Sequence, residues 1–175
     1  MSRYVALLRG VNVGGINIKM ADLKVAFAGL GYTDLRTVLA SGNVVFASDE
    51  TDTAATKQRI ETCLRETFGY EAWIVLLDLE TLRAIVDAYP FDPHKEGWHP
   101  YVVLSSDPVV LDGLAELRDG LDPQVERIRF GGGVLYWEVQ RGMSVNSAFG
   151  KQSSKARNKP NITTRNLRTL IKLLA

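Results

Sequence analysis

The chain has 175 residues, of which 46% are hydrophobic and 23% are charged, and this composition excludes disordered, fibrous and collagen-like proteins. Its single cysteine and two histidines exclude an intramolecular disulfide and argue against a cysteine-rich zinc site or a multi-histidine metal site, so we expect no metal and no cofactor. The net charge of +1 hides an asymmetry, because residues 1–140 sum to −7, whereas residues 141–175 sum to +8 and contain no acidic residue.

The first 78 residues predict the order β-α-β-β-α-β, which is the ferredoxin-like pattern. The expected elements are a strand at 4–8, a helix around 20–30, strands at 35–39 and 44–47, a helix at 53–68 and a strand at 73–77. We expect one four-stranded antiparallel sheet with both helices on one face. In this order the first strand pairs beside the third and the fourth.

The second half predicts the same order without a clear last strand. Its expected elements are a helix at 79–89, a strand at 101–104, a helix within 111–121, hairpin strands at 125–130 and 134–139, and helical segments at 147–155 and 164–174. We therefore expect an α+β fold with two ferredoxin-like halves, residues 1–78 and residues 79–140, of which the second is incomplete. Residues 141–175 are expected to form a basic C-terminal helical segment packed on this body.

The N-terminal residues do not resemble a secretory signal, because the apolar run is short and Arg9 interrupts it. No apolar run reaches the roughly 18 residues that a membrane span needs. The default expectation is a soluble cytoplasmic protein with no membrane partner, and the oligomeric state is left open.

Three segments together carry a resemblance to a known family. They are ALLRGVNVGG from Ala6 with MADL at 20–23, SGNVVF at 41–46, and TTRN at 163–166 with Thr169 and KL at 172–173. In order and spacing they resemble the bacterial family catalogued as domain of unknown function 1697. The resemblance implies a compact α+β protein built from ferredoxin-like parts, and it implies no activity. The family usually has an aromatic residue where this chain has Leu167, which argues against a stacking role at that position.

A glycine-rich loop follows the first predicted strand and has a cation at each end. Its glycines allow backbone N–H groups to approach an anion, and the N-terminus of the following helix adds a partial positive charge. The loop lacks the Lys-Ser/Thr pair of a nucleotide P-loop, and it lacks the dinucleotide-binding fingerprint. It either binds an anion or is a structural loop whose arginine pairs with an acidic residue of the body. The candidate anion-binding residues here are Arg9, Gly10, Asn12, Gly14, Gly15 and Lys19.

The predicted terminal helix supplies a second group of candidates. Thr163 or Thr164 is the expected N-cap, which places Arg165 in the first turn, where the helix dipole opposes a cation. A negative group is therefore expected near Arg165, either an internal carboxylate or a ligand phosphate. One hypothesis is that Arg9 and Arg165 face a shared anion. Thr164, Arg165, Asn166 and the more distant Lys151 complete the candidate anion-binding set.

A looser basic cluster precedes this helix and contains Lys151, Lys155, Arg157 and Lys159, with serines nearby. It is either a solvated loop or a surface that contacts phosphates. A related choice concerns the whole segment 141–175, which either binds a partner or folds back on the acidic body of the protein.

The sequence contains no strong catalytic motif, and it does not decide whether the protein is an enzyme. We expect a non-catalytic module that binds nucleic acid or another phosphate-bearing ligand. A second hypothesis is a small phosphoryl-group hydrolase with a mechanism like that of acylphosphatases. In this mechanism Arg9 would hold the phosphoryl group, and Asn12 or Asn43 would orient water. That hypothesis is an analogy of fold alone. A third is an interaction scaffold without a small ligand.

Overall fold

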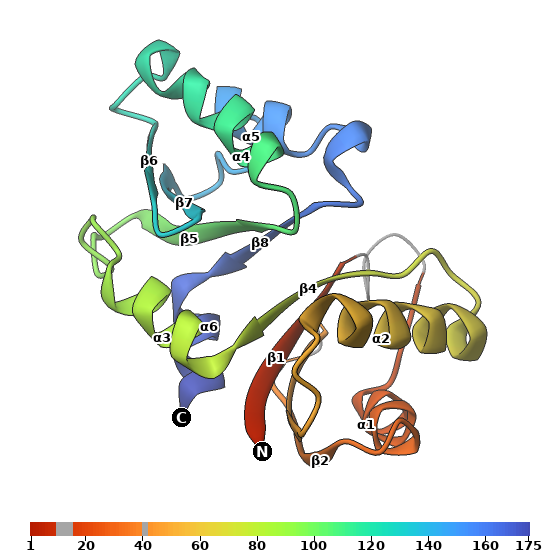
Figure 1. Ribbon diagram of the computed structural model, residues 1–175. Coiled ribbons are helices and arrows are strands. Elements are labelled where there is room, and N and C mark those ends of the chain that lie inside the picture. The colour runs from red at the N-terminus through yellow and green to blue at the C-terminus, as the bar shows by residue number, and fades with distance from the viewer. Residues whose placement is uncertain (10–15, 40–41) are drawn as a thin grey trace. The chain divides into compact units, whose positions relative to one another are not determined.

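The apolar runs of the chain build two four-stranded antiparallel sheets, as the computed structural model in Figure 1 shows. The structure describes residues 1–9, 16–39 and 42–175. It divides into two compact units: unit 1 contains Met1–Leu82 and Lys172–Ala175, and unit 2 contains Arg83–Ile171. The chain therefore passes from unit 1 to unit 2 within α3 (Leu79–Asp87) and returns within α6 (Leu167–Leu174).

Unit 1 has the predicted ferredoxin-like order. Its elements before α3 are β1 (Ser2–Arg9), α1 (Met20–Gly29), β2 (Thr33–Thr37), β3 (Asn43–Ser48), α2 (Thr53–Phe68) and β4 (Trp73–Asp78). The strand order is β2-β3-β1-β4, and Ala6 of β1 lies opposite Val44 of β3 and Leu76 of β4. The predicted pairing of the first strand with the third and fourth is confirmed.

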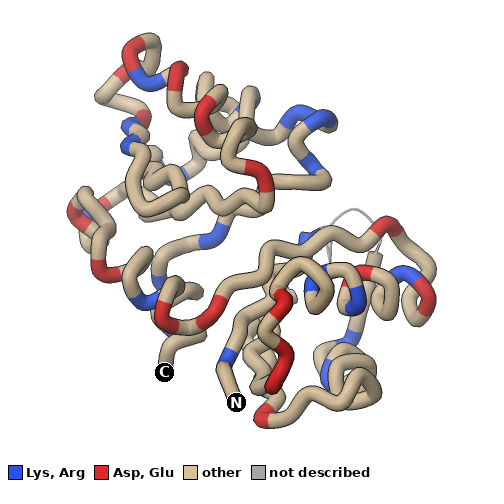
Figure 2. The backbone as a smooth tube through the Cα atoms, in the orientation of Figure 1, with Lys and Arg blue, Asp and Glu red and all other residues tan. Residues whose placement is uncertain are grey.

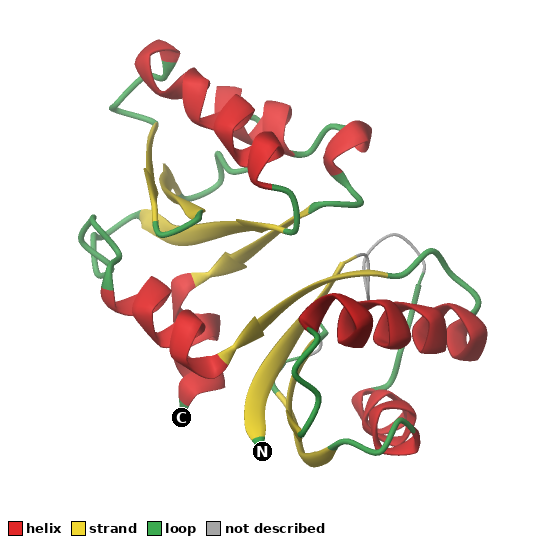
Figure 3. Cartoon of the chain, viewed as in Figure 1, coloured by secondary structure: helices red, strands yellow, loops and turns green. Residues whose placement is uncertain are grey.

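The core of unit 1 lies on one face of this sheet. Leu8 and Phe46 from the strands pack there with Phe27 of α1 and with Ile60 and Leu64 of α2. Both helices thus cover the same face, as predicted and as Figure 3 shows.

The ends of α2 follow from the sequence. Asp52 accepts a hydrogen bond from the backbone N–H of Ala55 at 3.0 Å, which satisfies a free donor of the first turn. Gly69 ends the helix with φ 66°, a left-handed conformation that glycine adopts without a steric penalty.

Residues 172–175 belong to unit 1 through Arg36 of β2. Its guanidinium donates to the carbonyl oxygens of Lys172 at 3.1 Å, Leu173 at 2.7 Å and Ala175 at 3.0 Å. The last carbonyls of a helix have no partner within the helix, so one arginine satisfies the end of α6.

Unit 2 contains a second complete sheet, and the expectation of an incomplete second half is wrong. Between α3 and α6 its elements are β5 (Trp98–Ser105), α4 (Pro108–Ala115), the 3-10 helix η1 (Glu116–Gly120), β6 (Glu126–Gly131), β7 (Val134–Gln140), α5 (Ala148–Ser153), the 3-10 helix η2 (Ala156–Asn158) and β8 (Ile162–Asn166). The strand order is β6-β7-β5-β8, the same as in unit 1.

The strand that the sequence analysis missed overlaps the start of the helix predicted at 164–174. Ile162, Thr163 and Thr164 are β-branched and favour extended backbone. They form β8, in which Thr164 lies opposite Val103 of β5. The helix α6 starts only at Leu167, so residues 141–175 are not helical throughout.

The core of unit 2 is aromatic at its centre. Trp137 of β7 packs against Phe149 of α5 and Tyr101 of β5, with ring centroids 5.0 and 5.2 Å apart. Leu111 and Leu114 of α4 complete this side of the sheet, which places α4 and α5 on one face.

One buried carboxylate joins α5 to the sheet. Glu126, which is 2% exposed, accepts hydrogen bonds from the indole N–H of Trp137 at 3.0 Å and from the backbone N–H of Phe149 at 3.2 Å.

In the described part of the chain, no helix is long and apolar enough to cross a membrane.

The Glu126→Ala substitution is expected to lower the free energy of unfolding of unit 2 by about 3 kcal/mol, because it leaves two buried donors without an acceptor. Glu126→Gln should cost less, since its one carbonyl oxygen still serves one donor. The control is Glu116→Ala, an exposed position in η1, where the change should stay within about 0.5 kcal/mol. Urea unfolding followed by tryptophan fluorescence measures all three, and equal values for Glu126→Ala and Glu116→Ala would contradict the role assigned to Glu126.

Candidate anion-binding surface

The glycine-rich loop falls mostly outside the described residues. Gly10, Asn12, Gly14 and Gly15 belong to this undescribed part, so the loop stays a prediction. Arg9 is the last residue of β1 and is half-buried, and this burial lowers the pKa of its guanidinium. Lys19 is exposed directly before α1.

The position expected for Arg165 is wrong. Arg165 lies on β8, opposite Val102 of β5, and is only 9% exposed. Its guanidinium donates to the hydroxyl of Thr163 and, at 3.2 Å, to the carbonyl oxygen of Thr164. Arg165 therefore does not oppose the dipole of α6, and the charge argument made for it from the sequence does not hold.

The three candidates of the terminal segment do not share one surface. Successive side chains of a strand point to opposite faces, so Thr164 and Asn166 lie on the face that carries α4 and α5, and Arg165 lies on the other. The N-cap of α6 is Asn166 rather than Thr163 or Thr164, because the Oδ1 atom of Asn166 accepts from the backbone N–H of Arg168 at 2.9 Å.

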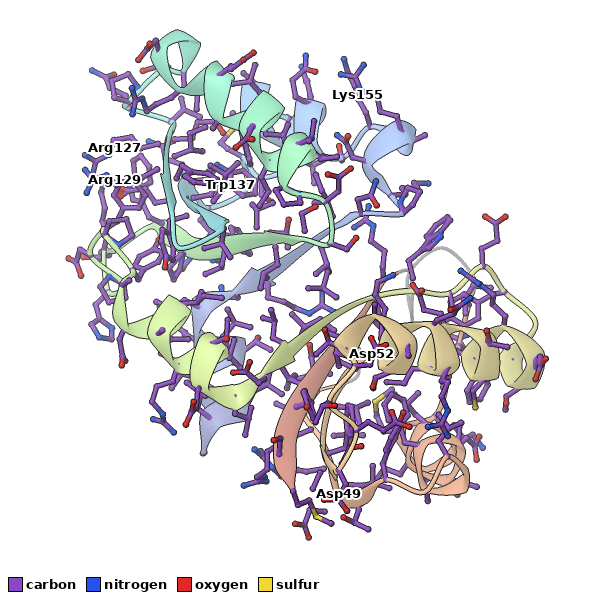
Figure 4. The ribbon with its side chains drawn as sticks, in the orientation of Figure 1. Asp49, Asp52, Arg127, Arg129, Trp137 and Lys155 are labelled. Carbon is purple, nitrogen blue, oxygen red and sulfur yellow. The ribbon has the colours of Figure 1, made fainter. Side chains whose placement is uncertain are left out.

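The residues of the basic cluster, by contrast, lie together in one short segment of the chain. We call residues 151–159 the basic segment. All four of its cations are exposed, and Figure 2 shows Lys and Arg positions gathered along it. Figure 4 shows Lys155 on its outer side. Within the described ranges, Lys151, Lys155 and Arg157 form no ion pair, so ion pairing with the acidic body does not account for these three charges.

Backbone contacts hold the basic segment in place. The hydroxyl of Ser147 accepts from the N–H of Gly150 at 3.0 Å, which caps α5. The hydroxyls of Ser153 and Ser154 both donate to the carbonyl oxygen of Gly150. The buried Asn158 donates to the carbonyl oxygen of Gln152 at 3.0 Å. The serines noted in the sequence thus bond to the backbone of this segment.

A groove of about 390 Å³ lies between α4 and the basic segment. One wall is aliphatic and comes from α4 and η1, and the other wall is polar and includes Arg157. The lining residues are Val109, Val110, Gly113, Leu114, Leu117, Gln152, Arg157 and Asn158. The sequence does not reveal this groove, because it depends on the packing of α4 beside α5.

Two observations bear on catalysis. Asn43 is fully buried, and its amide nitrogen donates to the carbonyl oxygen of Val38 at 2.8 Å. This hydrogen bond holds Val38, the residue after β2, beside the first residue of β3. Among the described residues, no three His, Cys, Asp or Glu side chains are grouped so that they could hold a metal ion.

The Gly150→Ala substitution is expected to displace the basic segment. An added Cβ atom would lie 2.0 Å from the carbonyl oxygen of Ser144, so the backbone must shift, and we expect a loss of about 2 kcal/mol or more. Gly113→Ala is the matched control, since a Cβ atom there meets nothing within 4 Å and alanine should stabilise α4 by about 0.5–1 kcal/mol. Urea unfolding measures both changes. A neutral Gly150→Ala variant would contradict the close packing of α5.

Comparison with known proteins agrees with this architecture. The family described as "Protein of unknown function (DUF1697)" matches residues 1–136. A solved structure of the conserved bacterial protein SP0830 from Streptococcus pneumoniae is similar in fold, with a TM-score of 0.80 and 24% identity, over 98% of this chain and 96% of that one. No curated protein matches the sequence. The match over residues 1–136 and the two sheets, with their common strand order, show that the chain belongs to the DUF1697 family.

Proposed function

We propose that this protein is a non-catalytic module that binds nucleic acid through the basic segment of unit 2. The observation that carries the proposal is the exposure of Lys151, Lys155 and Arg157 without an ion pair among the described residues. Their surroundings in the sequence add no negative charge, because residues 141–175 contain no acidic residue.

Electrostatics explains why such a segment suits a polyanion. Each phosphate that a lysine or arginine neutralises releases condensed counterions into solution, and this release drives binding. The hydrogen bonds around Gly150 and Asn158 fix the backbone that carries the cations, so little backbone conformational entropy is lost on binding.

The same surface predicts only a weak preference for particular base sequences in the nucleic acid. Phosphate contacts position a nucleic acid, whereas contacts with base edges or stacking on aromatic rings distinguish bases. The groove beside the basic segment is lined by aliphatic and polar residues without an aromatic ring among them. We therefore expect binding that depends on charge and is largely independent of sequence.

The other two hypotheses remain as outcomes of the experiment. A phosphoryl-group hydrolase would turn over acyl phosphates or phosphate esters, and an interaction scaffold would bind no nucleic acid at all. The basic segment does not favour a hydrolase, because the hydroxyls of Ser153 and Ser154 both donate to the carbonyl oxygen of Gly150.

The expected salt dependence is steep. With three or four phosphate contacts, the affinity for a short DNA duplex should fall about 40-fold or more between 50 and 200 mM salt. Fluorescence anisotropy with a labelled duplex measures this dependence. An affinity that hardly changes with salt would contradict the proposal.

The decisive variant is Lys151→Gln with Lys155→Gln and Arg157→Gln, which should remove most of the affinity and most of the salt dependence. Its matched control is Arg3→Gln with Lys24→Gln and Arg83→Gln, which removes the same charge from exposed positions elsewhere. If the control loses as much affinity as the first variant, net charge rather than the basic segment accounts for binding.

A further inference from the structure

The groove between α4 and the basic segment is not used by the phosphate contacts described above. Its volume of about 390 Å³ lies within the range of about 300–1,000 Å³ that is typical of small-molecule sites. Arg157, one of the three exposed cations assigned to nucleic-acid binding, also lines this groove. A strand whose phosphates contact Arg157 therefore has its bases close to the groove.

The aliphatic wall of the groove is open to a ligand. Val109 of α4 is 73% exposed, and Leu117 of η1 is half-buried. Gly113 lies on the same wall, and a Cβ atom added there would meet nothing within 4 Å. Among the described residues that line the groove, none is acidic, although Asp112 and Glu116 belong to the same part of the chain. The wall is therefore an uncharged apolar surface.

The polar wall carries two planar groups. Arg157 presents an exposed guanidinium. Gln152 lines the same groove, and its side-chain amide makes no hydrogen bond to another residue that the structure describes. The backbone of Gln152 is held in place, because its carbonyl oxygen accepts from Asn158 at 3.0 Å. A fixed backbone thus carries an amide that can still donate and accept.

These two walls match the chemistry of a nucleobase, which has two apolar faces and a polar edge. Aliphatic side chains can cover one face and remove its apolar surface from water. A guanidinium can stack on a base, and a glutamine amide can both donate to and accept from the edge of any base. In a duplex the faces are stacked and the edges are paired, so only an unpaired base offers these contacts.

We propose that this groove binds an unpaired nucleobase, so that the basic segment prefers single-stranded to double-stranded nucleic acid. The inference rests on the proposed function and names the form of nucleic acid that the same site selects. Positive charge beside an apolar wall fits this occupant, because each nucleotide joins a phosphate to a base. The contacts do not depend on which base is bound, so the weak preference for base sequence is retained.

Charge alone predicts the opposite order of affinities. A duplex has a higher density of phosphates than a single strand, and each phosphate that is neutralised on it releases more counterions. A surface that contacts only phosphates therefore favours the duplex. A preference for the single strand requires contacts with the bases.

The first test compares three labelled probes of equal length by fluorescence anisotropy at one low salt concentration. They are oligothymidylate, a strand made only of abasic units, and a DNA duplex. Oligothymidylate should bind about tenfold more tightly than the abasic strand, and more tightly than the duplex, because only its bases can enter the groove.

The outcomes separate this inference from the proposed function. Equal affinities for oligothymidylate and the abasic strand, with the steep salt dependence retained, would overturn the role of the groove and leave the basic segment as a phosphate-binding surface. A lack of binding to all three probes would refute both proposals.

The second test fills the groove without changing the charge. Gly113→Leu places a side chain where a Cβ atom meets nothing, and leucine favours a helix more than glycine does. Gly120→Leu is the matched control, since a Cβ atom there also meets nothing within 4 Å and Gly120 does not line the groove. Gly113→Leu should abolish the roughly tenfold preference for oligothymidylate over the abasic strand and leave the affinity for the duplex unchanged.

Thermal midpoints establish that both leucine variants are folded. Gly120→Leu should retain the full preference for oligothymidylate. A folded Gly113→Leu variant that also retains it, or equal losses for the two variants, would overturn the proposal.

Discussion

The pairing of β8 with β5 is the constraint on which the rest of unit 2 depends. Five residues from Ile162 to Asn166 extend along β5 and complete the second sheet. This pairing takes residues 164–166 out of the helix predicted at 164–174 and moves the N-cap to Asn166. It therefore brings Arg168 rather than Arg165 into the first turn of α6. The positions of the cations follow from where this strand ends.

Several cations of unit 2 that precede residue 140 have partners within the protein. On one face of the sheet, Lys95 and Arg127 share the buried carboxylate of Glu138. Lys95 also lies over the ring of Trp98 at 3.6 Å, and Arg127 and Arg129 lie over Phe91. Figure 4 shows Arg127 and Arg129 side by side at this edge. These cations stabilise the fold, because each has a carboxylate or an aromatic ring as its partner.

Six exposed cations after residue 140 have no such partners among the described residues. Arg141, Lys151, Lys155, Arg157, Arg168 and Lys172 form no ion pair there, although the first 140 residues of the chain carry a net charge of −7. What sets these cations apart is their one-sided charge, because residues 141–175 carry eight Lys and Arg residues and no acidic residue. This excess of positive charge supports external anions as their partners.

Much of the fold could be predicted from the sequence. In unit 1 the apolar run of β1, the helical spacing in α1 and α2 and the capping residues all act locally, so pattern and structure agree. In unit 2 the segment from Thr163 to Asn166 has two local interpretations, as a helix start and as a strand. Only the distant partner β5 decides between them.

The candidate site was less predictable for the same physical reason. The exposure of Lys151, Lys155 and Arg157 follows from the polar sequence around them. In contrast, the groove beside α4 depends on the packing of α4 beside α5, which brings together residues far apart in the chain. The burial of Arg165 depends on the register of β8 against β5.

The central claim is that the positive charge after residue 140 serves external anions and does not clamp the chain's own acidic residues. Its most direct test is a map of amide chemical-shift changes in the ¹⁵N-labelled protein as a short DNA duplex is added at low salt. The account predicts saturable changes concentrated in residues 151–159 that disappear when salt is raised. Changes spread evenly over exposed lysines and arginines of both units, or no saturable change, would contradict it.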